Sequence, residues 1–396
     1  MPLLQGIRIL DMTTVIAAPF AAGLMADFGA DVIKIEAPGK GDPFRVLGPY
    51  HNGLPMRWAA MSRNKRAITL DLHTPEGKEA FLDLAAKSDA LFENFRTGTL
   101  DKWGLDLETL RKVNPGLVVT RVTGYGQTGP YAHVAGFGTP ATAFSGMTYI
   151  TGHKDRAPVS PSFSLVDYIS GLYAAMGTMM ALYHRDALKG KAQEVDISLY
   201  ESIFRMMEIP VADYHKNGRI RERTPCLSGT SSPGGTYQTR DGKWLVLVCS
   251  TDRTWEYLTV AMNRPEMQQD PRFRSMRDRL ENNDVLDAIV AAWIKSLDYK
   301  DVKAVADKEG VPVSLVYSIE DIFRDPHYAA REDIVEMPHP ELGSIKMPGI
   351  FPKFSETPGE IRWVGPKLGA HNEEVFEGLL GYSKEKVAAL KARGVI

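Results

Sequence analysis

The chain has 396 residues, of which 44% are hydrophobic and 24% are charged, and its 47 basic and 49 acidic residues give a formal net charge of −2. This balance excludes a disordered chain and leaves no basic surplus for binding nucleic acid, while the length predicts more than one hydrophobic core. The two cysteines, Cys226 and Cys249, are too few for a disulfide framework or a structural zinc site, so we expect a reducing, cytoplasmic compartment.

The first forty residues predict a β-α-β unit. Strand-like residues run from Ile7 to Asp11 and from Ala30 to Glu36, and a helix with proline in its first turn runs from Pro19 to Phe28. The apolar stretch from Val15 to Ala26 lacks a preceding basic region, so it does not resemble an export signal. The loop before the helix contains no G-x-G-x-x-G pattern, which argues against a dinucleotide-dependent oxidoreductase.

Strands and helices continue to alternate up to about residue 122. The pattern predicts further strands and helices, namely strands Ala67 to Leu72, Asp89 to Phe95 and Leu117 to Val122, and helices Thr74 to Ser88 and Leu107 to Val113. Such alternation is typical of a mostly parallel sheet with helices on both faces. We therefore predict an α/β fold with a large Rossmann-like domain.

A long apolar helix is predicted from Ser164 to about Leu188, followed by a strand from Glu194 to Leu199. Its apolar stretch, Tyr168 to Tyr183, has 16 residues between Asp167 and His184, whereas crossing a bilayer requires about 20. We therefore predict a buried helix and no membrane partner.

The composition changes after this strand. Residues 216–235 are polar and rich in Pro, Gly and Ser, which is typical of a linker that ends in a loop. The residues that follow predict a hairpin, three helices and a strand, at Gly235 to Ser250, 253–263, 283–297, 299–309 and Val311 to Tyr317. The predicted organisation is a large α/β domain at 1–199, a linker at 200–227, a small α+β domain at 228–325, a second linker at 326–339, and a tail at 340–396 that packs back on the large domain.

Most catalytic motifs are absent from the sequence. It has no Walker loop, no paired histidines at metal-binding spacing and no G-x-S-x-G nucleophile, which leaves a carboxylate as the best candidate. Asp167 lies three residues after Ser164, at the start of the long helix. The pair fits a capping box, whereas an ionised, partly desolvated Asp167 fits a nucleophile toward an activated acyl group. The pattern leaves both interpretations open.

Ordered sequence blocks resemble one known family. The opening GIRILDMTTVIAAPFAAGLMADFGADVIKIEAPGKGDPFR, the block DYISGLYAAMG at 167–177 and the block LGAHNEEV at 368–375 are similar to the family III CoA-transferases. This CaiB/BaiF-like family includes formyl-CoA transferase, carnitine CoA-transferase and α-methylacyl-CoA racemase. The resemblance covers nearly the whole chain. It implies a CoA-transferase that forms an interlocked homodimer, takes acyl-CoA and carboxylate substrates, and uses neither a metal nor a redox cofactor.

The resemblance also implies a catalytic residue and a shielding loop. Asp167 opens the family's D-x-x-[ST]-G block and is expected to form an aspartyl–acyl mixed anhydride and then an aspartyl-CoA thioester. A loop that keeps water from these intermediates is expected at Gly234 and Gly235, which also fit an ordinary turn before the predicted hairpin.

CoA contacts are implied on two blocks of the large domain. They are expected at Leu70, His73, Asn94, Phe95, Arg96 and Lys102. An aromatic face suits adenine, and basic side chains suit phosphates. Arg96 and Lys102, taken singly, also fit plain surface charges. Asn64-Lys65-Arg66 is a weaker basic candidate.

Four positions depart from the family pattern. Phe137 stands where the racemase branch has an acid–base histidine, which disfavours an acyl-CoA racemase or isomerase. Gly138 replaces an acidic residue that many transferases keep. Ile16 replaces a Gln of formyl-CoA transferase, which argues against oxalate and formate as substrates. Ala37 replaces an Arg of that enzyme, so the CoA phosphate contact of that Arg must be replaced or lost. A non-catalytic CoA-binding protein is a further alternative, against which Asp167 argues. Dicarboxylates such as succinate are expected, because family members commonly use succinyl-CoA.

Overall fold

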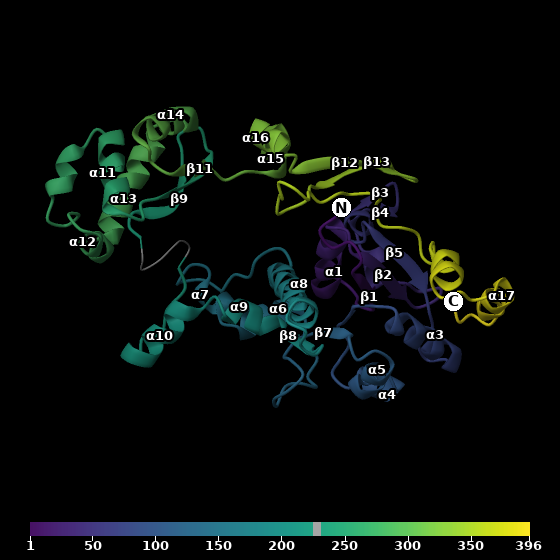
Figure 1. Ribbon diagram of the computed structural model, residues 1–396. Coiled ribbons are helices and arrows are strands. Elements are labelled where there is room, and N and C mark those ends of the chain that lie inside the picture. Colours follow the sequence, from purple (N-terminus) through teal and green to yellow (C-terminus); the bar gives the residue numbers. More distant parts are fainter. Residues whose placement is uncertain (225–230) are drawn as a thin grey trace. The chain divides into compact units, whose positions relative to one another are not determined.

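The computed structural model describes residues 1–224 and 231–396, and it contains two compact units (Figure 1). The large unit comprises Met1–Thr148, Ser160–Gly218 and Ala329–Ile396. The small unit comprises Tyr149–Val159 and Arg219–Tyr328. The chain therefore enters the small unit twice.

A parallel sheet forms the centre of the large unit. Its strand order is β5-β2-β1-β6-β7-β8, and its strands are β1 (Arg8–Asp11), β2 (Asp31–Glu36), β5 (Lys65–Thr69), β6 (Ala90–Glu93), β7 (Val118–Thr123) and β8 (Glu194–Ser198). Every pairing between neighbours is parallel, so the predicted Rossmann-like α/β fold is confirmed. The strand order reverses between β1 and β6. In such sheets ligands bind at the carboxyl ends of the strands beside this reversal.

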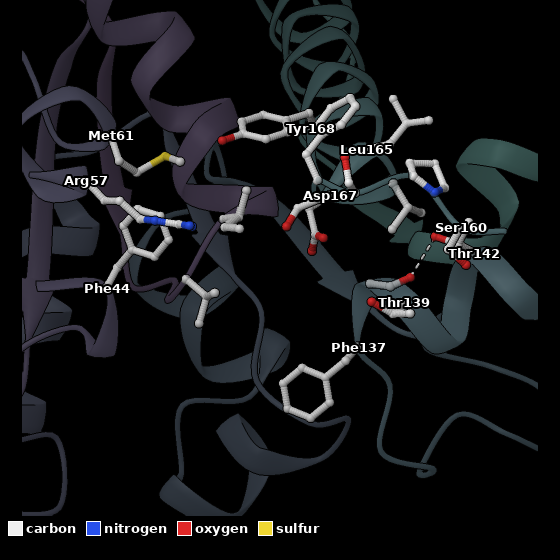
Figure 2. A pocket seen from close by; sticks show the side chains of 18 of the residues that line it. Phe44, Arg57, Met61, Phe137, Thr139, Thr142, Ser160, Leu165, Asp167 and Tyr168 are labelled. Carbon is white, nitrogen blue, oxygen red and sulfur yellow. Dashed lines mark hydrogen bonds between the residues drawn. The ribbon is translucent and has the colours of Figure 1, made fainter. Parts of the chain in front are cut away.

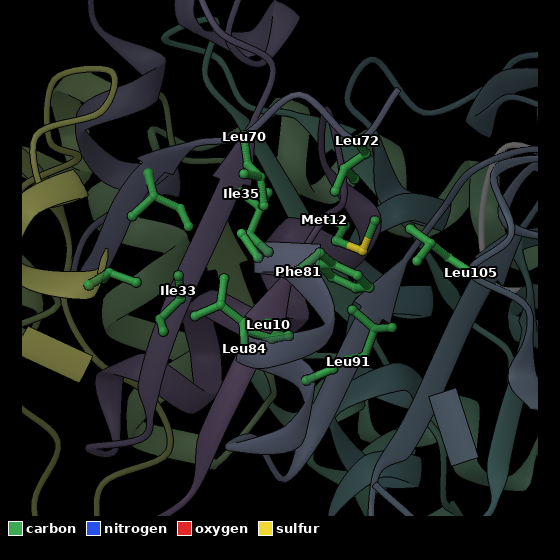
Figure 3. Close-up of a cluster of buried hydrophobic side chains, with 14 of the residues drawn as sticks. Leu10, Met12, Ile33, Ile35, Leu70, Leu72, Phe81, Leu84, Leu91 and Leu105 are labelled. Atoms are coloured by element: carbon green, nitrogen blue, oxygen red, sulfur yellow. The ribbon is translucent and has the colours of Figure 1, made fainter. Parts of the chain in front are cut away.

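Hydrophobic cores cover both faces of the sheet. One contains Phe81 and Leu84 of α3 (Pro75–Ala86), packed against strand residues such as Leu10 (Figure 3). The other lies beneath α1 (Ala17–Asp27) and α8 (Leu165–Asp186). These two helices approach closely because α8 has a glycine at the contact. A Cβ added to Gly171 would lie 2.6 Å from the carbonyl oxygen of Ala17.

Helix α8 differs from its prediction as a buried helix. One side packs on α1, but Leu172, Met176, Met180 and Tyr183 on the other side are 46–62% exposed. In the described part of the chain, α8 is the one helix long and apolar enough to cross a membrane, and 39% of its most apolar stretch is buried. Among the described residues this apolar face is left open, while the opposite side of α8 contacts α1 and α9.

The small unit contains the predicted hairpin and helices. β9 (Gly234–Gln238), β10 (Trp244–Val248) and β11 (Val313–Leu315) form an antiparallel sheet in the order β11-β10-β9. Helices α11 (Asp252–Ala261), α13 (Asn283–Lys295) and α14 (Tyr299–Glu309) pack on it around a core that includes Trp255 and Phe273.

The two predicted linkers differ from the structure. Residues 199–217 form α9 (Leu199–Phe204) and α10 (Glu208–Asn217), and the large unit extends to Gly218. The apolar residues of α9 pack against α8, which accounts for the order of α9. In the second predicted linker, β12 (Ile334–His339) pairs with β13 (Gly343–Pro348) as a hairpin. Residues 225–227 of the first linker, with Cys226, lie outside the described residues.

Shorter elements complete the chain. They are η1 (Pro43–Val46), β3 (Tyr50–His51), β4 (Leu54–Pro55), α2 (Arg57–Met61), α4 (Thr99–Trp103), α5 (Leu107–Val113), α6 (Gly138–Phe144), α7 (Met147–Ile150), η2 (Pro265–Gln269), α12 (Met276–Glu281), α15 (Ile319–Arg324), α16 (Pro326–Ala330), η3 (Glu374–Leu379) and α17 (Lys384–Ala392).

Candidate active site

Asp167 lies in the first turn of α8, and it is not part of a capping box. Ser164 occupies the N-cap position, but its side chain makes no capping hydrogen bond. Among the described residues, the donor that acts on the Asp167 carboxylate is the backbone N–H of Asp167 itself. The capping interpretation of this pair is therefore wrong, and the carboxylate is available for chemistry.

The Asp167 carboxylate is partly buried among apolar side chains. Burial raises its pKa from 3.8 to about 6, and its own backbone N–H opposes part of that rise. At pH 7 about ten carboxylates are ionised for each one that is protonated. The group is thus an anion that has lost much of its water and retains more basicity than an exposed aspartate, as a carboxylate nucleophile requires.

Gly138 leaves the space that the Asp167 carboxylate fills. A Cβ added to Gly138 would lie 2.2 Å from Oδ2 of Asp167, which is far closer than any real contact. The segment before it is also held closely, because a Cβ added to Gly136 would lie 2.5 Å from Cα of Gly124. The departure at Gly138 therefore has a steric reason in this chain.

A pocket of about 800 Å³ opens in front of Asp167 (Figure 2). Arg57 and Met61 lie on one side of the pocket, and Thr142 and Ser160 lie on the other. The Thr142 hydroxyl donates a hydrogen bond to the carbonyl oxygen of Gly138. The pocket wall is otherwise mostly apolar, and all of it belongs to the large unit.

Two smaller cavities continue from this pocket along the carboxyl ends of the strands. The first, of about 240 Å³, shares Asp167 with the pocket and reaches Asn94, Phe95 and Arg96. The second, of about 150 Å³, shares Phe95 with the first and reaches Leu70 and His73. Five residues predicted to contact CoA thus lie along one path that ends at Asp167. Lys102 is exposed and lines none of these three cavities.

The far end of this path is aromatic. Trp103 makes edge contacts with His73 and with Phe95, each with ring centroids 4.9 Å apart. Asn94 has a structural role there, because its side chain exchanges hydrogen bonds of 2.9 and 2.8 Å with the backbone of Thr14. Trp103 was not predicted as a site residue, because its only signal in the sequence is its place in the block that contains Asn94 and Phe95.

Buried charges support the loop between β1 and α1. Lys65 was a weak CoA candidate, but its Nζ is fully buried and lies 2.8 Å from Asp11. The Nζ of Lys34 lies 3.6 Å from Asp11 and 3.2 Å from Asp42. Burial disfavours the ionised form of Asp11, but the two lysine charges outweigh it and lower its pKa. This cluster was not predicted from the sequence.

The same cluster holds a strained residue beside the pocket. Val15 has a φ of 71°, which a β-branched side chain rarely adopts. Its backbone N–H donates a hydrogen bond of 3.2 Å to Asp42 Oδ1. Val15 and the adjacent Ile16 line the pocket and the first cavity. Strained residues of this kind cost about 1–3 kcal/mol and gather at functional sites.

Gly234 and Gly235 lie in strand β9 rather than in a loop. They are buried, and they pair with Val248 and Leu247 of β10. Because both glycines pair with β10 as part of the antiparallel sheet, the predicted turn is absent at these positions. Because both glycines belong to the small unit, their contact with the reacting groups stays a prediction.

Comparisons with known proteins show the family to which the chain is related. The model of CoA-transferase family III matches residues 4–372. Succinyl-CoA–D-citramalate CoA-transferase of Chloroflexus aurantiacus is 41% identical over 394 residues, which cover 99% of this chain and 98% of the relative. The beta subunit of succinyl-CoA–L-malate CoA-transferase from that organism is 43% identical over 397 residues, with the same coverage. A crystal structure of a CaiB/BaiF family protein from Brucella suis has a TM-score of 0.83 at 30% identity, and it covers 96% of this chain and 99% of that chain.

Proposed function

The chain belongs to CoA-transferase family III, and on that premise we propose that it transfers coenzyme A between carboxylic acids with Asp167 as the nucleophile. One observation carries this proposal. The Asp167 carboxylate, without a partner side chain among the described residues, lies where the path lined by the predicted CoA residues meets the pocket of about 800 Å³. This arrangement suits a thioester that enters from one side and an acid that occupies the other.

The first half of the reaction loads CoA onto the enzyme. A carboxylate oxygen of Asp167 attacks the thioester carbon, the C–S bond breaks, and CoA leaves as a thiolate. The thiolate then attacks the aspartyl carbonyl of the mixed anhydride and releases the donor acid as a carboxylate. The product is an aspartyl-CoA thioester. No net proton is consumed, and no group is oxidised or reduced.

The second half reverses these steps with a different acid. The acceptor carboxylate attacks the aspartyl-CoA carbonyl, and the CoA thiolate leaves again. It then attacks the acyl carbon of the new anhydride, which forms the product thioester and restores the Asp167 carboxylate. This chemistry requires neither a metal nor a redox cofactor, and the apolar side chains of Ile16 and Val166 suit it by keeping water from the anhydrides.

The donor is proposed to be succinyl-CoA. The two Chloroflexus enzymes are named for transfer from succinyl-CoA to citramalate or malate. Extending that donor to this chain agrees with the hydroxyl groups of Thr139 and Ser160, which line the pocket and suit a polar acyl group.

We also propose a cytoplasmic homodimer in which a second copy covers α8. The exposed residues Leu172, Met176, Met180 and Tyr183 recur at spacings of four, four and three, so they form one apolar stripe. Monomers rarely expose such a continuous surface. Light scattering should give the mass of a dimer, and Met180→Glu should shift it toward the monomer. A monomeric wild type that floats with lipid vesicles would contradict this assignment.

The proposed mechanism is tested by trapping the enzyme-bound intermediate. Wild-type protein incubated with succinyl-CoA and then with hydroxylamine should carry a modified peptide that contains Asp167. Asp167→Asn should bind CoA but give neither modification nor transfer. An Asp167→Asn variant that is folded and still turns over would refute the mechanism.

A further inference from the structure

We propose that Arg57 binds the distal carboxylate of the acyl group and makes the enzyme selective for thioesters of dicarboxylic acids. The inference rests on the proposed function, because it assumes that the acyl group reacts at Asp167. It assigns a specificity role to a residue that the sequence analysis did not single out.

Arg57 is the one basic side chain that lines the pocket in front of Asp167 among the described residues. It begins helix α2, and it is exposed. Its guanidinium contacts the ring of Phe44, with Cζ 5.7 Å from the ring centroid. Within the described chain it makes neither a hydrogen bond nor an ion pair, and its charge therefore has no protein counter-ion.

Two other arginines of the large unit, Arg45 and Arg63, each have a carboxylate partner, which Arg57 lacks among the described residues. Arg45 binds Glu36 through two nitrogens at 2.7 and 2.6 Å. Arg63 binds Asp27 in the same way, at 3.0 and 2.6 Å. Both are mostly buried and carry out structural roles. Arg57 is the exception, because its fork of donors faces an open pocket. Such a fork matches the geometry of a carboxylate.

The position of Arg57 suits a ligand with two carboxyl groups. Figure 2 shows its side chain beside Phe44 and Met61, with the Asp167 carboxylate farther along the pocket. Burial raises the pKa of Tyr168, and the positive charge of Arg57 opposes part of that rise. The guanidinium is therefore near Tyr168, and Figure 2 shows it apart from the Asp167 carboxylate.

This separation leaves room for a short carbon chain. A thioester carbonyl at Asp167 directs the rest of the acyl group into the pocket, where the mostly apolar wall accommodates methylene groups. A terminal carboxylate would then meet the guanidinium of Arg57 and gain a charge-assisted hydrogen bond. A terminal methyl group would leave Arg57 without a partner. This difference would make the enzyme prefer thioesters of dicarboxylic acids to those of monocarboxylic acids.

The experiment compares two acyl groups that differ only at the far end. Exchange of CoA between succinyl-CoA and labelled succinate is measured beside exchange between butyryl-CoA and labelled butyrate, so each assay uses one acid. Arg57→Met should lower kcat/KM for succinyl exchange by about 10- to 100-fold and leave butyryl exchange within about threefold. Arg57→Lys should restore part of the succinyl activity. Arg111→Met, on the exposed side of α5, is the control.

The ratio of the two activities separates the possible outcomes. Equal losses on both acids in Arg57→Met, or no loss on succinyl-CoA, would overturn the role of Arg57, because a purely structural residue does not change the ratio. If Arg57→Met does not fold, the ratio in Arg57→Lys decides in the same way. A wild type that exchanges neither acid would instead contradict the proposed function.

Discussion

Replacing Asp167 with asparagine should stabilise the folded protein at neutral pH while it abolishes CoA transfer. Burial raises the pKa of this carboxyl to about 6 from 3.8, so the folded state binds the proton more tightly than the unfolded state. Below pH 4 the group is neutral in both states and carries no penalty. Between pH 4 and 6 the unfolded state ionises first, and stability falls. Above pH 6 the full penalty remains.

The two pKa values set the size of the effect. The penalty is about 1.6 kcal/mol at pH 5 and about 3 kcal/mol at pH 8, because each unit of pKa difference corresponds to about 1.4 kcal/mol. Partial solvent access to the side chain makes these figures upper limits. Asparagine has no charge to bury at either pH. The variant should therefore gain about 1–3 kcal/mol at pH 8 and about half as much at pH 5.

Urea unfolding of the wild type and Asp167→Asn at pH 5 and pH 8 measures this difference. Asp106 provides the matched control, because it is a true N-cap whose carboxylate accepts a hydrogen bond of 2.8 Å from the N–H of Thr109. Asp106→Ala should lose about 0.5–2 kcal/mol. If Asp167→Asn is instead less stable than the wild type at pH 8, the carboxylate supports the fold and our account of its burial is wrong.

Four further results are expected. The rate of transfer should fall tenfold per pH unit below about pH 6, as Asp167 becomes protonated, and a profile flat to pH 4.5 would exclude it as the titrating nucleophile. Gly138→Ala should reduce kcat by about 100-fold or more through displacement of the carboxylate, whereas Gly378→Ala, which has open space, should be neutral in the same assay. Lys65→Met should cost about 3–5 kcal/mol in urea unfolding, because it leaves the buried Asp11 carboxylate without this ion pair, and a near-wild-type midpoint would contradict that role. Since Phe137 cannot act as a base, a 2-methylacyl-CoA should gain no deuterium from heavy water at turnover rates, as judged by mass spectrometry.

Local patterns predicted much of the large unit because its elements depend on neighbouring residues. The helix Leu107–Val113 was predicted with its observed bounds, since Asp106 caps its start. The alternation of strands and helices along the sequence was sufficient to predict the parallel sheet. The helix at 199–204 was missed because the polar stretch at 216–235 suggested a linker that starts earlier, whereas Leu199 and Ile203 pack in the core beneath α8, which starts at residue 165.

The chemistry of the site was less predictable where it depends on distant partners. A lysine in a sequence is normally expected at the surface, and Lys65 is buried only because Asp11, 54 residues earlier, lies beside it. Both faces of α8 carry apolar residues, so their presence in the sequence could not show which face lacks a neighbour. Arg57 gave no signal because an arginine without a partner is recognised only after the pocket is known.

The double passage of the chain between units restricts how this protein can be divided. The small unit begins at Tyr149, returns to the large unit after Val159, and resumes at Arg219. Its first segment is bonded to the second, since the Tyr149 hydroxyl donates to Glu222 at 3.0 Å. A fragment cut at Arg219 would therefore lack part of its own structure, and a large unit stripped of 149–159 would lose the residues that lead into Ser160. A chimera that takes its small unit from a relative must therefore replace residues 149–159 and 219–328 together.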